Sequence, residues 1–153
     1  MHPAIRHVPD PEHPGWWTWD LLEPDRFNHA LGPLRVRPDG PGRGLCRMLP
    51  GPKQSNLGSA LHGGALMAFL DVALFAGGRM AGMGDFDAVT LAMSIQFVGA
   101  GRLDVSLVAE VELIRETGRL VFLRGLATQE EAVVASFTGT LRKLAPRTLA
   151  GGA

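Results

Sequence analysis

The residue types best suited to chemistry lie close together near the middle of the chain. A polar Asn56 is followed by the tripeptide His62–Gly64, and a single carboxylate, Asp71, interrupts the otherwise apolar run 65–76. A helix that is apolar on nearly all sides belongs in a core. A carboxylate there is costly unless it is paired, hydrogen-bonded or facing a polar cleft. Either a core hydroxyl or backbone group satisfies Asp71, or it is a catalytic carboxylate in a pocket; we favour the pocket.

Two glycines, Gly63 and Gly64, lie where this helix should begin. The first N–H groups of a helix lack internal partners and carry partial positive charge, and glycine lets a ligand approach them closely. This predicts a site for an anion or a developing oxyanion. Asp71 lies eight residues beyond Gly63, about 12 Å along a helix axis. If Gly63 and Asp71 are to act on the same carbonyl, they must therefore come from two copies of the helix, as in a two-fold dimer with antiparallel helices.

The elements that must position these residues follow from hydrophobic periodicity and turn residues. We expect a short helix at 24–31, a first strand at 44–49, the core helix at 63–80, and strands at 88–98, 103–114, 120–128 and 132–144. In the strand at 88–98, Val89, Leu91, Met93, Ile95 and Phe97 should share one apolar face. With turns at 99–102 and 115–118, the four strands should form an antiparallel meander. A sheet curled around one buried helix gives an α+β fold.

The composition narrows the class of protein. The chain has 153 residues, which suits one core-forming domain, and 15 basic residues balance 15 acidic ones. This balance argues against a nucleic-acid partner. The beginning of the chain lacks the apolar run of a signal peptide, and the longest apolar stretch should be too short to span a membrane. We therefore expect a cytoplasmic protein.

Disulfide and metal chemistry find little support. Cys46 is the single cysteine, and we expect it to be a small buried hydrophobe. His2, His7 and His13 match no metal-ligand spacing, so no metal site is expected.

The first 15 residues hold four of the 11 prolines, which predicts an extended or mobile arm. Trp16, Trp17 and Trp19 follow it and should pack the arm onto the body, the alternative being a hydrophobic lid over an acyl pocket. We divide the chain into an arm with a short helix (1–30), a main domain (31–145) and a C-terminal tail (146–153).

The pattern over about residues 30–144 resembles the hotdog-fold thioesterases, most closely the PaaI-like branch of acyl-CoA thioesterases. The resemblance rests on Asn56, the His62–Gly64 tripeptide, Asp71 and the Val89–Thr90 pair that opens the long strand. The later segments FVGAGRL, EVELIRETGRLVFLRG and VASFTGTLRKL also fit. The fold it implies is an antiparallel β-sheet wrapped around one long central helix.

The resemblance also implies roles for individual residues. Asp71 would be the base, or else the nucleophile, of thioester hydrolysis. The Gly63 amide would polarise the thioester carbonyl from the partner subunit, Asn56 would position the carbonyl or the water, and Thr90 would hold the water. His62 would orient the loop and Asn56 rather than act as a base.

We also expect Gly64, Leu61 and Met67 to contact the substrate, an acyl-CoA. No cofactor is expected, because coenzyme A is part of the substrate. The family commonly forms homodimers through the long strand, and such dimers often pair into homotetramers.

Two other functions remain open within the same fold. One is an acyl-thioester dehydratase or hydratase, whose site uses a histidine with an acidic partner in a different arrangement. The other is a non-catalytic acyl-CoA binding protein, because fold alone does not establish turnover.

Overall fold

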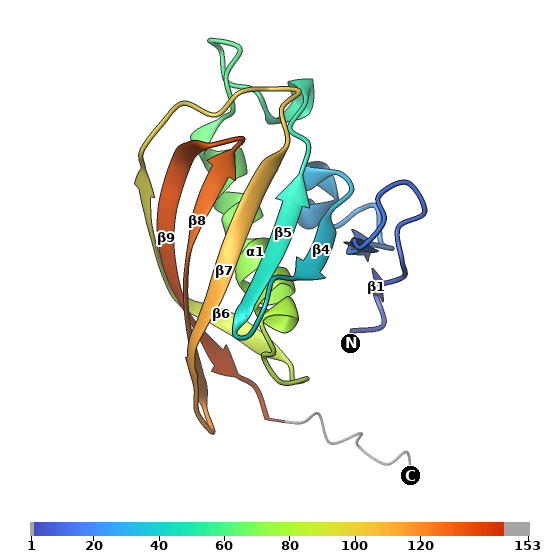
Figure 1. Ribbon diagram of the computed structural model, residues 1–153, viewed down its shortest axis with the longest axis vertical. Helices are drawn as coiled ribbons and strands as arrows, with labels where there is room; N and C mark the ends of the chain where they lie inside the picture. Colours follow the sequence, from blue (N-terminus) through green and yellow to red (C-terminus); the bar gives the residue numbers. More distant parts are fainter. Residues whose placement is uncertain (1, 146–153) are drawn as a thin grey trace.

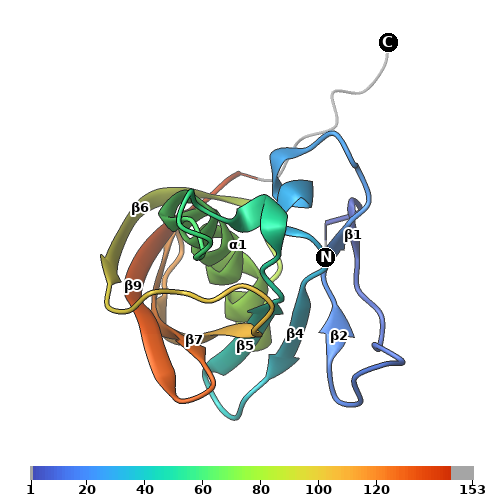
Figure 2. The same cartoon turned by 90° about the horizontal axis from the view of Figure 1, so that it is seen from above.

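The computed structural model describes residues 2–145, so the predicted tail at 146–153 lies outside the described residues. One long helix, α1 (Gly63–Met80), lies against a seven-stranded antiparallel sheet with strand order β2-β4-β5-β7-β8-β9-β6. The sheet curls around the helix (Figure 1, Figure 2). This confirms the predicted α+β architecture, a sheet wrapped around one central helix.

The main sheet contains two short strands, one of intermediate length and four long ones: β2 (Trp17–Thr18), β4 (Arg35–Pro38), β5 (Arg43–Met48), β6 (Ala88–Phe97), β7 (Leu107–Glu116), β8 (Leu120–Gln129) and β9 (Ala132–Lys143). A separate pair is formed by β1 (Ile5–Arg6) and β3 (Asp20–Leu21). The predicted helix at 24–31 is a short 3₁₀ helix, η1 (Phe27–Leu31), and a second one, η2 (Pro52–Gln54), precedes Asn56.

The central helix has the predicted bounds, and small residues bring it close to the sheet. A Cβ on Gly77 would lie 2.5 Å from Val111 Cγ2 of β7. A Cβ on Gly44 of β5 would collide with the Gly77 carbonyl and lie 2.6 Å from Met80 Cβ. Real Cβ atoms do not approach so closely, so glycine is required on both sides of this contact.

By length and composition alone, α1 is long and apolar enough to cross a membrane. Our expectation that the longest apolar stretch is too short for this is therefore wrong. Half of its 18 residues are buried inside the molecule, as in the core helix of a globular protein.

The strand order corrects the predicted meander. Strands β7, β8 and β9 follow one another as expected, but β6 pairs with β9 and not with β7. Residues 98–106 therefore form a crossover connection, where we predicted a turn at 99–102. Buried Gln129 holds this connection, since its side chain accepts from Arg102 N–H (2.7 Å) and donates to the Arg102 and Val105 carbonyls (both 2.8 Å). Periodicity identifies the faces of a strand, but it does not identify its neighbours.

The predicted alternation in β6 is wrong in its first half. Val89 and Leu91 are 40% and 58% exposed, whereas Thr90 reaches α1 through its hydroxyl. The cause is a β-bulge at Leu91, where the pairing with β9 shifts by one residue. The extra residue reverses the alternation, so beyond it Met93 and Ile95 pack against the core as predicted.

The N-terminal arm is extended, as predicted, and packs against the body. Trp19 is buried in the core, and its backbone N–H donates to the Leu34 carbonyl (3.0 Å). Trp16 lies beneath the guanidinium groups of Arg37 and Arg47, 5.0 and 4.6 Å from its ring centroid. These contacts confirm that Trp16 and Trp19 pack the arm onto the body, whereas Trp17 is 38% exposed and its ring stacks on His7 of the arm.

Candidate active site

The site begins with Asp71, which lies two turns into α1 on the side that faces the start of β6. Its side chain is half-buried, and its Oδ1 accepts a 2.6 Å hydrogen bond from the Thr90 hydroxyl. The bulge at Leu91 makes this contact possible because it leaves Thr90 on the helix side of the strand. Within residues 2–145 no hydrogen bond occupies the second carboxylate oxygen, so this oxygen can accept a proton or bind water.

Asp71 lines a cavity of about 630 Å³. This volume lies in the usual range for small-molecule sites, roughly 300–1,000 Å³. Val72, Phe75 and Arg79 of α1 line it together with residues 85–88, which lead into β6. The carboxylate therefore opens into a space able to hold a ligand, which favours the pocket over a carboxylate satisfied only by the core.

The start of α1 has the geometry of an oxyanion donor. His62 is the N-cap residue, and its Nδ1 accepts a 2.9 Å hydrogen bond from Gly64 N–H. In the described part of the chain, nothing accepts from Gly63 N–H. Gly63 lies near the opposite end of β6, since a Cβ there would be 3.5 Å from the Phe97 ring. His62 thus uses a ring nitrogen to cap the helix, which fits the predicted orienting role.

Asn56 lies in the exposed loop before the helix and does not meet Asp71 in the single chain. Its Oδ1 accepts from Gly58 N–H (2.8 Å) and Ala60 N–H (3.0 Å), which closes the loop on itself. The loop is joined to the helix start because Gln54 O accepts from His62 N–H (2.8 Å). The Asn56 oxygen is therefore structural, and its amide N–H₂ is the part suited to a substrate.

The predicted substrate contacts differ in their exposure. Met67 is 47% exposed on α1, and Gly64 is exposed at the helix start. Leu61 is a core residue that packs against Gly101 and leaves only 7% of its surface exposed. Gly64 and Met67 are available to a ligand, whereas most of Leu61 is committed to packing.

Sequence reasoning named one lining residue, Trp19, through the alternative of a lid over an acyl pocket, and missed the others. Phe75 and Arg79 follow Asp71 at i+4 and i+8, so one helix face carries all three, and this spacing could have identified them. The arm also lines the cavity, with Ile5 and Trp19. The arm and the helix are about 50 residues apart in the sequence, and no sequence signal shows that they lie side by side.

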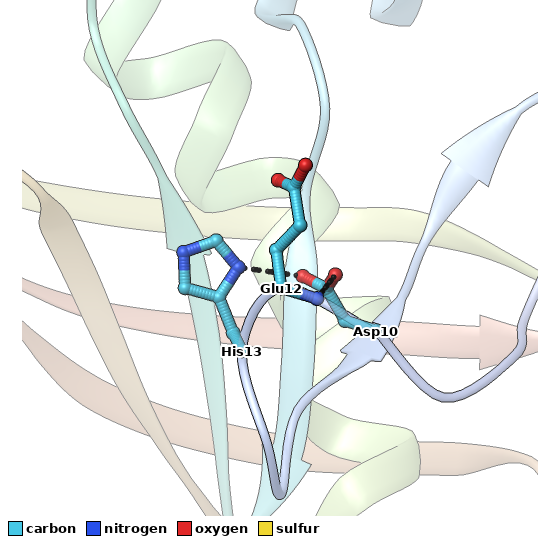
Figure 3. A group of neighbouring side chains, drawn as sticks. All are labelled: Asp10, Glu12 and His13. Carbon is cyan, nitrogen blue, oxygen red and sulfur yellow. Dashed lines mark hydrogen bonds and ion pairs between the residues drawn. The ribbon is translucent and has the colours of Figure 1, made fainter.

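A second polar cluster, Asp10, Glu12 and His13, has three potential metal-ligand atoms within 4.8 Å of one another. Figure 3 shows the His13 ring directed at the Asp10 carboxylate, and this pair is 2.8 Å apart. Arg35 Nε also donates to Asp10, at 2.5 Å, and Arg35 Nη1 donates to Asp20 at 3.0 Å. Because a guanidinium already neutralises Asp10, this cluster fastens the arm to β4 and gives no support for a cation site.

The electrostatics of Asp10 agree with this structural role. Burial would raise the pKa of its carboxyl, but hydrogen bonds from Glu12 N–H, His13 and Arg35 outweigh that effect and lower the pKa to about 2. Cys46 shows the opposite case, since burial raises the pKa of its thiol to about 12. Cys46 is fully buried and free, as predicted, and is no nucleophile.

Comparisons with known proteins agree with this geometry. A sequence profile described as Thioesterase superfamily matches residues 58–136, more than half of the chain. The chain therefore belongs to the thioesterase superfamily. No curated protein matches it.

Solved structures extend the comparison. A mutant of the phenylacetic acid degradation protein PaaI from Thermus thermophilus is similar at 27% identity and a TM-score of 0.65, over 78% of this chain and 100% of that one. A Streptococcus pneumoniae TIGR4 hypothetical thioesterase solved with coenzyme A has the same fold at 22% identity and a TM-score of 0.64, over 75% and 91% of the two chains. So does smu.793 from Streptococcus mutans UA159, bound to acetyl-CoA, at 21% identity and a TM-score of 0.64, over 74% and 90%. These findings confirm a PaaI-like hotdog thioesterase.

Proposed function

We propose that this protein is an acyl-CoA thioesterase that hydrolyses a thioester to a free acid and coenzyme A. The observation that carries the proposal is the Asp71 carboxylate, held by Thr90 at 2.6 Å and facing a cavity of about 630 Å³. Asp71 takes a proton from water as the water oxygen bonds to the thioester carbon. Collapse of the tetrahedral intermediate breaks the C–S bond, and the departing thiolate receives that proton. No metal or cofactor takes part.

The carbonyl oxygen needs donors where negative charge develops. Gly63 N–H suits this role because it lies at a helix N-terminus, and the Asn56 amide can add a second hydrogen bond. Gly63 and Asp71 of one helix are about 12 Å apart along the axis. We therefore assign Gly63 and Asp71 of each working site to different subunits.

The edge of the sheet supports such a dimer. Strand β6 is ten residues long, ends the sheet, and pairs only with β9 among the described strands. Its exposed apolar residues include Leu91 and Phe97, 58% and 56% exposed, and Val98 just beyond the strand is 59% exposed. A long unprotected apolar edge is a template for pairing with another strand. We infer that the occupant is β6 of a second copy.

The positions of the site residues along β6 fit this pairing. Gly63 lies near Phe97, and Asp71 lies near Thr90, so α1 and β6 run in opposite directions. Antiparallel pairing of two β6 strands centred between residues 93 and 94 puts Phe97 of one subunit opposite Thr90 of the other. The helix start of each subunit then comes close to Asp71 of its neighbour.

The choice of acyl-CoA as substrate is supported by the relatives. The Streptococcus pneumoniae thioesterase was solved with coenzyme A and the Streptococcus mutans protein with acetyl-CoA. Met67 and Gly64 offer an exposed surface beside the helix start where the pantetheine arm of such a substrate can lie.

The test is thiol release from a panel of aromatic and straight-chain acyl-CoAs, with wild type and Asp71→Asn side by side. We expect turnover by the wild type and none by the variant, whose fold and acyl-CoA binding are retained. Full activity of Asp71→Asn would remove Asp71 from the mechanism. Wild type that binds acyl-CoAs without releasing thiol would favour a binding protein, and hydration of crotonyl-CoA would favour a hydratase.

A mixing experiment tests the shared site. Gly63→Pro replaces the N–H with a ring that the site can hold. Proline is tolerated at the first helical position, His62 already has the extended backbone (φ −67°, ψ 131°) that suits a residue before proline, and a Cβ at Gly63 makes only an ordinary 3.5 Å contact with the Phe97 ring. Gly63→Ala, which keeps the N–H, is the matched control and should stay active. Mixed Gly63→Pro and Asp71→Asn subunits should regain about a quarter of wild-type activity, since half the dimers are mixed and each has one working site. No recovery after confirmed subunit exchange would refute a shared site.

A further inference from the structure

One wall of the cavity beside Asp71 is built by the N-terminal arm. Ile5 of β1, Trp19 and Asn28 of η1 line it together with Val72 and Phe75 of α1. A second cavity of about 230 Å³ adjoins it, since both are lined by Ile5, Trp19, Asn28 and Val72. The space next to the catalytic carboxylate therefore continues beneath the arm.

The arm is fastened firmly enough to act as a wall. Arg35 of β4 joins two of its carboxylates, Asp10 at 2.5 Å and Asp20 at 3.0 Å. Strand β1 pairs with β3, and Ala4 O accepts from Leu22 N–H at 2.9 Å. The pairing with β3 fixes Ile5 within the arm, and Arg35 ties the arm to the body.

The chemistry of the cavity favours a neutral, apolar acyl group. Aromatic rings from Trp19, Phe75 and Phe86 line it, and Asp71 and Asp87 add negative charge. These carboxylates would repel a carboxylate on the acyl chain.

The basic group on the helix side of the cavity is already engaged. Arg79 pairs with Asp85 at 3.0 Å, donates to the Gly84 and Phe86 carbonyls, and lies 5.2 Å from the Phe86 ring centroid. It is therefore poorly placed to bind a carboxylate on the substrate.

We propose that the N-terminal arm, through Ile5 and Trp19, forms the wall that selects the acyl group, and that it admits neutral apolar acyl chains or aryl rings. This inference rests on the proposed thioesterase function. The arm lies outside residues 58–136, which the superfamily profile matches. The Thermus PaaI chain is covered completely and aligns with 78% of this one.

The experiment narrows the cavity from two directions. Ile5→Trp fills it from the arm, and Asn28→Trp, at an exposed position of η1, fills it without disturbing the core. Val8→Trp is the matched control, since Val8 is 38% exposed on the same arm and lines neither cavity. Thermal unfolding confirms that each variant is folded. The substrates are acetyl-, hexanoyl-, phenylacetyl-, decanoyl- and adipoyl-CoA.

We expect both cavity variants to lose about tenfold or more in kcat/KM for phenylacetyl- and decanoyl-CoA, with acetyl-CoA changed less than about twofold. Val8→Trp should match wild type throughout. An unchanged acyl profile in both cavity variants would overturn the assignment while leaving thioesterase activity established. Wild type that hydrolyses adipoyl-CoA as well as hexanoyl-CoA would overturn the preference for neutral chains.

A binding measurement separates this inference from the proposed function. The Kd of non-hydrolysable S-alkyl-CoA thioethers of increasing length is measured by calorimetry for the same proteins. If no acyl-CoA is hydrolysed but long thioethers bind more weakly to both cavity variants than to wild type, the acyl-selecting role of the arm is supported and the proposed thioesterase activity is refuted. If the Kd values of the thioethers for both cavity variants also equal those for wild type, the acyl-selecting role of the arm is refuted as well.

Discussion

Substituting Thr90 with valine tests whether the hydroxyl that holds Asp71 serves the reaction. Valine has nearly the same shape, so Thr90→Val removes one hydrogen bond, at 2.6 Å, and little else. A hydrogen bond to a charged group is worth about 1.5–3 kcal/mol. At about 1.36 kcal/mol per factor of ten, kcat should fall by about 10- to 100-fold.

The assay is thiol release from the best acyl-CoA of the panel, with kcat and KM measured separately. Because Thr90 positions Asp71 and does not bind the acyl chain, we expect the loss in kcat with KM nearly unchanged. Thr90→Ser keeps the hydroxyl and should restore most of the rate. Thermal unfolding should show that both variants remain folded. A Thr90→Val enzyme with wild-type kcat would show that this hydrogen bond plays no part in catalysis.

Three further predictions follow from the packing and the charges. Gly44→Ala should lower the free energy of unfolding by about 1–3 kcal/mol in urea titrations, because the added Cβ meets the backbone of α1. Gly118→Ala is the control and should be nearly neutral, since nothing lies within 4 Å of its Cβ position. Equal stabilities of the two variants would refute the close helix–sheet contact. Asp10 has a folded-state pKa of about 2 against an ordinary 3.8, so its stabilisation is present above about pH 4 and is lost as the pH falls through about 2. Asp10→Asn should therefore be less stable than wild type at pH 6, with the difference shrinking toward pH 2, and a pH-independent difference would contradict the ion pairing. The Cys46 thiol is buried, and burial raises its pKa to about 12. It should therefore not react with a thiol dye in the folded protein at pH 8, whereas the protein unfolded in guanidinium should give one reactive thiol per chain. Prompt reaction of the folded protein would contradict the burial of Cys46.

Much of the fold can be predicted because local patterns carry it. The helix predicted at 63–80 is correct at both ends, since His62 caps the first turn and the apolar run continues to Met80. Alternation identifies the long strands, but it does not place β6 beside β9. Strand neighbours depend on where the chain returns, and here buried Gln129 secures a crossover that resembles a simple turn in sequence.

The candidate site can be predicted only in part. The sequence indicates Asp71 and Thr90 and the structure joins them, but the bulge at Leu91 that turns Thr90 toward the helix has no local signal. The role of the arm is also hidden. Trp19 is expected to pack the arm onto the body or to cover an acyl pocket. It packs in the core, and only the tertiary structure reveals that the same residue lines a cavity with Asp71.

The pairing of β6 with β9 also has a consequence for the order in which the protein assembles. Register partners run from Ala88 with Lys143 to Phe97 with Ala135, so β6 has no neighbour in its own sheet until almost the whole described chain exists. Contacts between segments so distant in sequence form late, since the loop between them must close first. A chain emerging from the ribosome carries Asp71 and Thr90 long before β9 can hold them together. The site and the proposed dimer edge therefore form in the same late step.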